Sequence, residues 1–236
     1  MGCACLVWRA RAQSLAPHRI LVFTRTMGYH HASIPDGVKA IEQLASVHQV
    51  QVDTTSDAHV FQMPDLRRYA AIVFLNTTGN VLDSLQQLAF QQYIRGGGGY
   101  VGIHAAADCE YDWPWYGKLV GAYFKSHPAV QQARLWIQLD PRFPELEAFP
   151  HPWVRTDEWY NWRMPPAADQ VHVLIWLDEN SYKGGENGSY HPVVWYHDME
   201  GGRAFYMEFG HTAESYAEPA FLQLLWLGLQ YAMGEK

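Results

Sequence analysis

The segment from Gly96 to Asp108, Gly-Gly-Gly-Gly-Tyr-Val-Gly-Ile-His-Ala-Ala-Ala-Asp, constrains the fold more than any other part of the chain. Its apolar centre predicts a buried strand. The small residues Gly102 and Ala106 on either side of His104 leave room for a sharp turn from strand to helix, an elbow that in several enzymes presents a Ser or Cys nucleophile. An imidazole at this position argues against acyl transfer. Acid–base chemistry, metal ligation, ligand binding and a structural role as a helix cap stay open.

The four glycines at the start of this segment precede a strand, not a helix. A phosphate-binding loop must open a helix, so that backbone N–H groups and the helix dipole face the anion. We interpret the run as a helix end followed by a tight turn, and no Gly-x-Gly-x-x-Gly pattern stands elsewhere in the chain. No nucleotide cofactor is therefore expected.

Apolar runs alternate with amphipathic segments from Arg19 onward, which predicts a single α/β domain with a doubly wound, mostly parallel sheet. In the helix expected over 83–95, Leu85, Leu88, Ala89 and Tyr93 should form the buried face. The remaining helices are expected over 37–47 and 217–232. Strands are expected over 20–23, 49–52, 70–75, 100–103, 133–139, 171–177, 193–196 and 204–209.

Composition excludes several classes of protein. The net charge is −7 and no basic run is present, which argues against nucleic acid as a partner. No stretch approaches the roughly 18 apolar residues that span a bilayer, and no signal-peptide pattern is present, so we expect a cytoplasmic protein. Residues 1–18 read as a disordered tail outside the fold. Its Cys3 and Cys5 lack a second pair for zinc, and Cys109 is expected to be a small buried thiol.

Polar and aromatic residues gather in the loops that follow the predicted strands. Ligands in open α/β sheets bind at the carboxyl ends of the strands, so these loops should form one site. Each residue alone has a structural explanation, but five loops that reach one end favour a site. The loops are residues 24–33, 76–80, 104–108, 111–127 and 210–212.

Ordered blocks along residues 19–235 resemble the trehalose-utilisation (ThuA-like) family. This resemblance implies the class I glutamine amidotransferase-like, flavodoxin-like fold, with His104 at the position of the usual Cys. Amidotransferase activity is therefore not implied. The blocks that carry the resemblance are Phe-Thr-Arg-Thr-x-Gly-Tyr-x-His-Ala-Ser-Ile-Pro over 23–35, together with residues 74–79, 97–108, 110–116, 126–128, 157–161, 178–179, 181–182, 184–185, 191–192, 201–203 and 210–212.

The same resemblance implies a role in the metabolism of trehalose or related sugars, with a functional link to oxidoreductases that make 3-keto sugars. A ketone at carbon 3 acidifies the neighbouring C–H group, so a His or carboxylate can remove that proton and begin isomerisation or elimination. An isomerase, lyase or hydrolase that acts on a 3-keto-glycoside is the expectation. A non-catalytic carbohydrate-binding or adaptor protein on a degenerate amidotransferase fold is the alternative.

On the enzyme hypothesis we expect two overlapping sets of chemical groups. The catalytic candidates are His104, His211, Asp108, which would orient His104, and Glu158. A divalent zinc or manganese ion would be held by His31, His104, His127 and His211, with Asp157 or Glu158 as carboxylate. The sugar-binding candidates are Arg25, Tyr29, Thr77, Thr78, Tyr111, Trp113, Trp115, Trp159 and Tyr160.

Two features of the carboxyl-terminal part leave questions open. The last expected helix carries Phe221, Leu224, Leu225, Trp226 and Leu229, more apolar residues than one sheet face demands. Either a homodimer interface or burial within the monomer accounts for them. Tyr206-Met-Glu-Phe-Gly210 stands where relatives more usually have Tyr-Thr-x-x-Gly, and it places Glu208 one strand step from the expected site.

Overall fold

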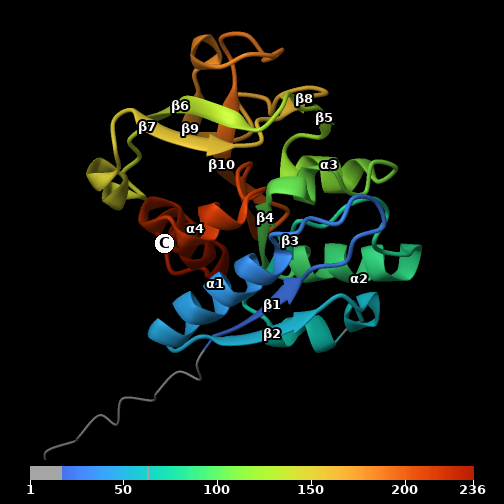
Figure 1. The fold of residues 1–236 in the computed structure, drawn as a ribbon. Coiled ribbons are helices and arrows are strands. Elements are labelled where there is room, and N and C mark those ends of the chain that lie inside the picture. Colours follow the sequence, from blue (N-terminus) through green and yellow to red (C-terminus); the bar gives the residue numbers. More distant parts are fainter. Residues whose placement is uncertain (1–17, 63) are drawn as a thin grey trace, which may run out of the picture.

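A computed structural model describes residues 18–62 and 64–236. The tail expected at residues 1–18, with Cys3 and Cys5, lies outside these residues except for His18. In the described part of the chain, nine strands form one sheet in the order β2-β1-β3-β4-β11-β10-β9-β6-β7 (Figure 1). The fold is the expected flavodoxin-like α/β domain.

One half of the sheet, which we call the parallel half, consists of five strands that all pair in parallel. Two of them, β3 (Ala71–Leu75) and β4 (Gly99–Ile103), are buried along their entire length, as is typical of strands covered on both faces. In sheet order they are β2 (Gln51–Thr55), β1 (Arg19–Phe23), β3 (Ala71–Leu75), β4 (Gly99–Ile103) and β11 (Gly202–Met207).

The other half, which we call the antiparallel half, continues the sheet through four strands in antiparallel pairs. They are β10 (Pro192–Met199), β9 (His172–Leu177), β6 (Gln131–Ile137) and β7 (Trp153–Asp157). In β7 buried and exposed residues alternate, because one face of this edge strand packs on the core and the other faces solvent. A separate two-stranded sheet joins β5 (Phe124–Ser126) and β8 (Asn161–Trp162).

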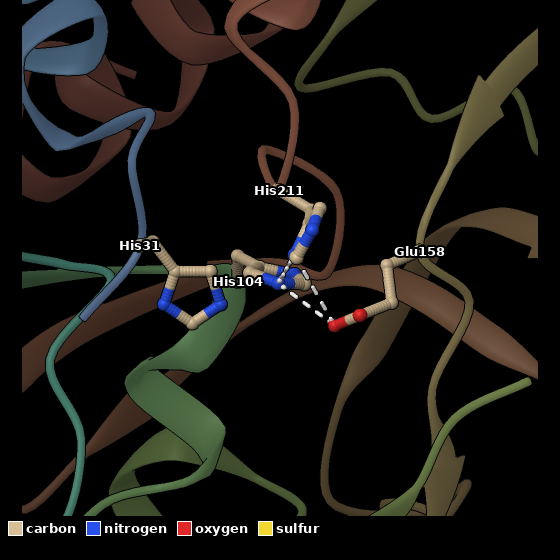
Figure 2. A group of neighbouring side chains, drawn as sticks. All are labelled: His31, His104, Glu158 and His211. Carbon is tan, nitrogen blue, oxygen red and sulfur yellow. Dashed lines mark hydrogen bonds and ion pairs between the residues drawn. The ribbon is translucent and has the colours of Figure 1, made fainter. Parts of the chain in front are cut away.

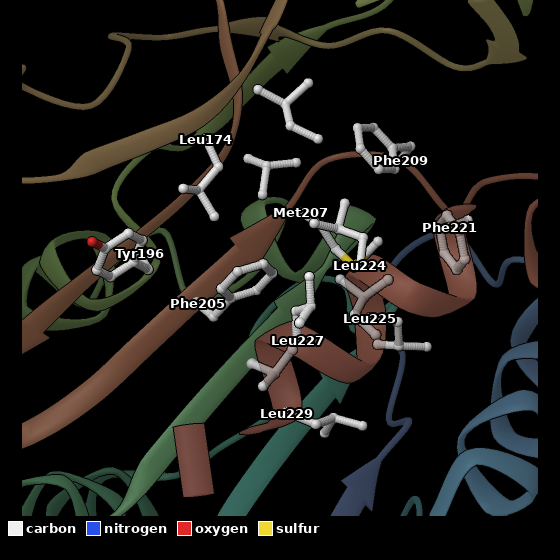
Figure 3. Close-up of a cluster of buried hydrophobic side chains, with 14 of the residues drawn as sticks. Leu174, Tyr196, Phe205, Met207, Phe209, Phe221, Leu224, Leu225, Leu227 and Leu229 are labelled. Atoms are coloured by element: carbon white, nitrogen blue, oxygen red, sulfur yellow. The ribbon is translucent and has the colours of Figure 1, made fainter. Parts of the chain in front are cut away.

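Helices cover both faces of the sheet. α1 (Ile34–Val47) and α4 (Pro219–Met233) pack on one face, while α2 (Ser84–Arg95) and α3 (Pro114–Val120) pack on the other. Alternate residues of a strand therefore enter different cores: Ile20 and Val22 of β1 enter the first, and Leu21 and Phe23 the second. Figure 3 shows the first core, where leucines of α4 pack against β11.

The predicted buried face of α2 is wrong in part. Leu85 and Leu88 are 76% and 48% exposed, whereas Ala89 and Tyr93 are buried as expected. Phe90 and Ile94 complete the stripe that meets the sheet, since residues three and four positions apart share a helix face. Asp83 fixes the start of α2 through a capping box with Gln86, and this start sets the rotation of the helix.

The apolar surface of α4 is used inside the monomer. Phe221, Leu224, Leu225 and Leu229 are fully buried, and the half-buried Trp226 stacks on His48 of the α1 end. A homodimer stays a prediction. Three strands, β5, β7 and β8, and the helix α3 were not predicted from the sequence, because each is short or alternates polar with apolar residues. No helix within the described residues is both long and apolar enough to cross a membrane.

Candidate functional site

The elbow after β4 is present and has an unusual backbone. His104 opens a short 3-10 turn over residues 104–107 with φ of 49°, a left-handed conformation that non-glycine residues adopt rarely. Tyr206 of the neighbouring strand holds this turn, since its hydroxyl donates to the His104 carbonyl at 2.8 Å. A side chain at Gly102 would collide with Tyr100 and Tyr206, which explains the small residue before the turn.

Four side chains meet at the elbow, and we call them the tetrad: His31, His104, Glu158 and His211 (Figure 2). His31 follows β1, His104 follows β4, His211 follows β11 and Glu158 follows β7, so both halves of the sheet contribute. One ligand atom from each lies within 4.8 Å of the other three, and the group could hold a metal ion.

Three members of the tetrad form a tight triangle. His104 Nε2 lies 3.3 Å from His211 Nδ1 and 3.4 Å from Glu158 Oε2, and the third side, from His211 Nδ1 to Glu158 Oε2, measures 3.3 Å. Donors that each sit about 2.1 Å from a tetrahedral ion are about 3.4 Å apart. The triangle therefore has the spacing of three ligands on one face of an ion.

The tautomer of His104 follows from its partners. Its Nδ1 lies 2.6 Å from the backbone carbonyl oxygen of Glu208, which only accepts, so Nδ1 carries the proton. In the neutral ring, Nε2 then has one lone pair, which faces the triangle and accepts from the Tyr160 hydroxyl at 2.9 Å; a metal ion bound there would take the place of this hydrogen bond. A carbonyl that fixes the tautomer of a histidine in this way is common behind metal-binding imidazoles.

Burial and charge shift the pKa values of the other tetrad members. Burial acts to raise the pKa of Glu158, but its contacts with the His104 and His211 rings outweigh burial and hold this pKa well below its usual range. The hydrogen bond to Glu158 raises the pKa of His211. Burial, followed by repulsion from His104 and His211, lowers the pKa of His31 to about 3, so this ring is neutral at physiological pH. Its buried Nδ1 has no hydrogen-bond partner among the described residues.

The two carboxylates that the sequence left as alternatives have different places. Glu158 joins the tetrad, whereas Asp157 lies behind it and accepts hydrogen bonds from the backbone N–H groups of Gly210 and His211, both at 3.1 Å. Asp157 also accepts from Ser215 and pairs with the buried Arg155 at 3.2 Å. It thus fixes the turn that carries His211.

His127 and Asp108 lie beside the tetrad rather than in it. His127 Nδ1 is 3.1 Å from Glu158 Oε1, and its side chain is 43% exposed. Asp108 accepts a hydrogen bond of 2.6 Å from the Tyr111 hydroxyl. The contacts that orient His104 come instead from Glu208 and Tyr160.

The aromatic sugar-binding candidates separate into different environments. Tyr160 is buried against His104, with 4.5 Å between ring centroids, and Tyr29 is 64% exposed with its ring 4.8 Å from His31. Trp159 lies fully buried in the core. Trp113 and Trp115 stack on each other and pack against Phe90 of α2, and Trp115 donates to Glu200 in the turn between β10 and β11.

Of the remaining candidates, Thr78 holds the loop that carries His31. Thr78 accepts from the Gly28 N–H and donates to the Tyr29 carbonyl, while its own carbonyl accepts from Met27 at 2.7 Å. Thr77 is buried beside it, and Arg25 is half-buried in the same loop. No contact of Arg25 or Thr77 with the tetrad is recorded among the described residues.

Some functional positions were not predicted. Arg155, with its ion pair to Asp157, escaped attention because β7 was not predicted. The alternation of Trp153, Arg155 and Asp157 with Val154 and Thr156 is the signal that indicates them, since it places the three on the inner face. The contact of the Tyr206 hydroxyl with the elbow backbone has no sequence signal that we can identify.

Comparison with known proteins agrees with this architecture. A putative ThuA-like protein from Bacteroides uniformis is 24% identical, with a TM-score of 0.78 and 95% of each chain covered. One from Parabacteroides merdae is 20% identical, with a TM-score of 0.76 over 93% of this chain and 91% of that one. A cytoplasmic protein from Salmonella typhimurium is 14% identical, with a TM-score of 0.61 over 90% of this chain and 98% of that one.

These likenesses to solved structures show the fold. No functionally characterised protein in a curated collection matches the chain. The model of the ThuA family, described as trehalose utilisation, matches residues 19–232, which is most of the chain. The chain therefore belongs to the ThuA, or trehalose-utilisation, family.

Proposed function

We propose that the protein is an enzyme of sugar metabolism that acts on a 3-keto-glycoside at the tetrad, with a divalent zinc or manganese ion. The observation that carries this proposal is the triangle of His104, His211 and Glu158, with sides of 3.3–3.4 Å and His31 beside it. The family description, trehalose utilisation, supports the substrate class.

The chemistry of the tetrad fits a metal ion. Imidazole nitrogen and carboxylate oxygen are the ligands of zinc and manganese, and histidine must be neutral to bind. His31 meets this condition and has a buried nitrogen without a partner, while His104 presents a lone pair to the triangle. His31, His104, His211 and Glu158 would hold the ion. A bound ion would supply Lewis-acid stabilisation of negative charge that develops on the sugar carbonyl oxygen.

Exposure divides the histidines by role. The His104 side chain is completely buried, so it cannot touch a substrate and serves as a ligand. His211, 22% exposed, and His127 lie where a sugar can reach them. Because His211 Nδ1 faces the ion, we assign proton transfer to His127: it removes the proton from C2, the electron pair forms the C1=C2 bond as the glycosidic C1–O bond breaks, and the same imidazole returns the proton to the departing oxygen.

The sugar would stack on Tyr29, the exposed ring beside His31. Glu158 would restrain His127, since one carboxylate oxygen faces the triangle and the other faces His127 Nδ1. An imidazole held through Nδ1 presents Nε2 outward for proton transfer. Thr78 would act indirectly, by holding the loop that presents Tyr29.

Turnover of 3-keto-trehalose and the metal content of the purified protein test this proposal together. We expect about one zinc or manganese ion per chain in the wild type by elemental mass spectrometry, its loss in His104→Ala, and no turnover by that variant. His30→Ala, a change at an exposed histidine of the same loop, is the matched control and should keep the metal. Saturable sugar binding without turnover would show instead that the protein is a non-catalytic carbohydrate-binding protein.

The cellular setting follows from the same proposal. An oxidoreductase that converts a glycoside to its 3-keto form must supply the substrate, so we propose a functional link to such an enzyme. We propose a cytoplasmic location, because the Salmonella typhimurium protein of this fold is described as cytoplasmic. Comparison of enzyme activity in fractionated cells checks the location.

A further inference from the structure

Glu208 contacts the elbow histidine by two routes. It follows β11 and is completely buried, and its backbone carbonyl accepts from His104 Nδ1 at 2.6 Å. Its side-chain Oε1 accepts from the backbone N–H of Tyr160 at 2.7 Å, and the Tyr160 hydroxyl lies 2.9 Å from His104 Nε2. Both nitrogens of the His104 ring are thus held by groups that Glu208 places.

Burial of the Glu208 carboxyl group is energetically unfavourable at this position. Its Oε2 is buried without a hydrogen-bond partner among the described residues, a situation that disfavours folding. His191 Nε2, 3.9 Å away, is the nearest charged or titratable partner recorded for this atom. A buried carboxyl group with one unpaired oxygen contributes little to stability. The hydrogen bond of Oε1 with the Tyr160 N–H is therefore the interaction that accounts for a glutamate here.

We infer that Glu208 is a positioning residue, whose carboxyl oxygen fixes the Tyr160 hydroxyl on His104 Nε2 and thereby the orientation of the elbow imidazole. Loss of Oε1 would leave the Tyr160 N–H without its acceptor and allow the Tyr160 hydroxyl to move. The His104 ring could then rotate away from the triangle. The use of His104 as a metal ligand rests on the proposed function. The orientation of its ring does not.

Three variants test this inference. Glu208→Gln keeps a carbonyl oxygen that can accept from the Tyr160 N–H, while Glu208→Ala removes it. Glu110→Ala is the matched control, because Glu110 is another buried glutamate that accepts from backbone N–H groups, those of Val81 and Leu82, outside the tetrad. Each variant is compared with the wild type by Tm, by ¹⁵N spectra of the histidine rings and by zinc affinity in competition with a chelator.

In Glu208→Ala we expect the His104 Nε2 resonance, identified by its absence in His104→Ala, to shift, and zinc binding to weaken by about 10–100-fold, as is usual for groups that orient a ligand. Glu208→Gln should show the wild-type His104 Nε2 resonance and the wild-type zinc affinity. Glu110→Ala should lower Tm and leave both unchanged. An unshifted resonance in Glu208→Ala, or a Glu208→Gln variant as impaired as Glu208→Ala, would overturn the inference.

The two proposals can fail separately. If the metal-free wild type shows the expected resonance and Glu208→Ala shifts it, Glu208 positions His104 whether or not zinc binds. Absence of zinc binding in the wild type would then contradict only the metal in the proposed function. Zinc binding that is equally tight in all three variants would contradict the positioning role alone.

Discussion

The two halves of the sheet differ in how they are covered and in what they give to the site. Two strands of the parallel half are buried along their whole length, and this half delivers three histidines from the ends of β1, β4 and β11. The antiparallel half ends in a half-exposed edge strand, β7, and delivers one carboxylate, Glu158. The parallel half thus supplies the imidazole nitrogens of the tetrad, and the antiparallel half supplies its carboxylate charge.

The site therefore depends on contacts between the parallel half and the antiparallel half. Asp157, at the end of β7, holds the turn of His211, which belongs to β11. Arg155, in the same strand, is buried and pairs with Asp157 and with Glu218 ahead of α4. A small buried network therefore joins the edge of one half to a loop of the other.

The largest effect should come from breaking that network. Asp157→Ala removes one of the two carboxylate partners of the buried Arg155 and leaves two backbone N–H groups without an acceptor, so we expect a loss of about 3–5 kcal/mol in the free energy of unfolding. Urea denaturation measures it, with the exposed Asp169→Ala as the control. A loss below about 1 kcal/mol would mean that the halves are joined elsewhere.

The next effect separates the contribution of the antiparallel half to metal binding. Glu158→Gln preserves shape but removes the only negative charge of the tetrad, and we expect zinc affinity to fall by at least about 100-fold. Chelator competition measures the affinity, and Glu147→Gln, at an exposed site, should behave as the wild type. If Glu158→Gln binds zinc normally, the three histidines suffice and the carboxylate serves another purpose.

A smaller effect concerns pH. The pKa of His211 is raised in the folded state, so its protonation stabilises the metal-free protein below pH 6.5, and this stabilisation is lost as pH rises through the raised pKa. Zinc requires the deprotonated ring, so zinc affinity should increase over the same rise. The difference in unfolding free energy between wild type and His211→Gln should therefore shrink from pH 6 to 9 in urea denaturation of the metal-free proteins. A difference independent of pH would contradict the Glu158 contact.

The smallest effect lies in the parallel half, on the outer side of α2. Leu88→Ala should change the free energy of unfolding by about 0.5 kcal/mol or less, because Leu88 is largely exposed. Phe90→Ala, a buried neighbour, should cost about 3–5 kcal/mol in the same denaturation experiment. Equal losses of unfolding free energy in Leu88→Ala and Phe90→Ala would show that α2 is rotated from the position described.

The sequence predicted the two halves with different success, for a physical reason. Buried strands such as β3 are continuous apolar runs, and their boundaries were predicted to within a residue or two. β7 mixes Trp153, Arg155 and Asp157 on its inner face, so its hydrophobic signal is weak. The members of the tetrad were all among the predicted residues, because strand-end loops are identifiable from the chain. Which of them touch depends on side-chain directions that only the packed structure defines.

The places of the four tetrad residues along the chain have a consequence for folding. His31 lies near the beginning, Glu158 in the second half and His211 close to the end, so no fragment that lacks either terminal region contains the whole set. An ion on these side chains would act as a cross-link between distant segments, and it would bind the native chain in preference to the unfolded one. Zinc would then bind during refolding only after β11, the last strand in the chain, has joined the sheet, because His211 follows that strand.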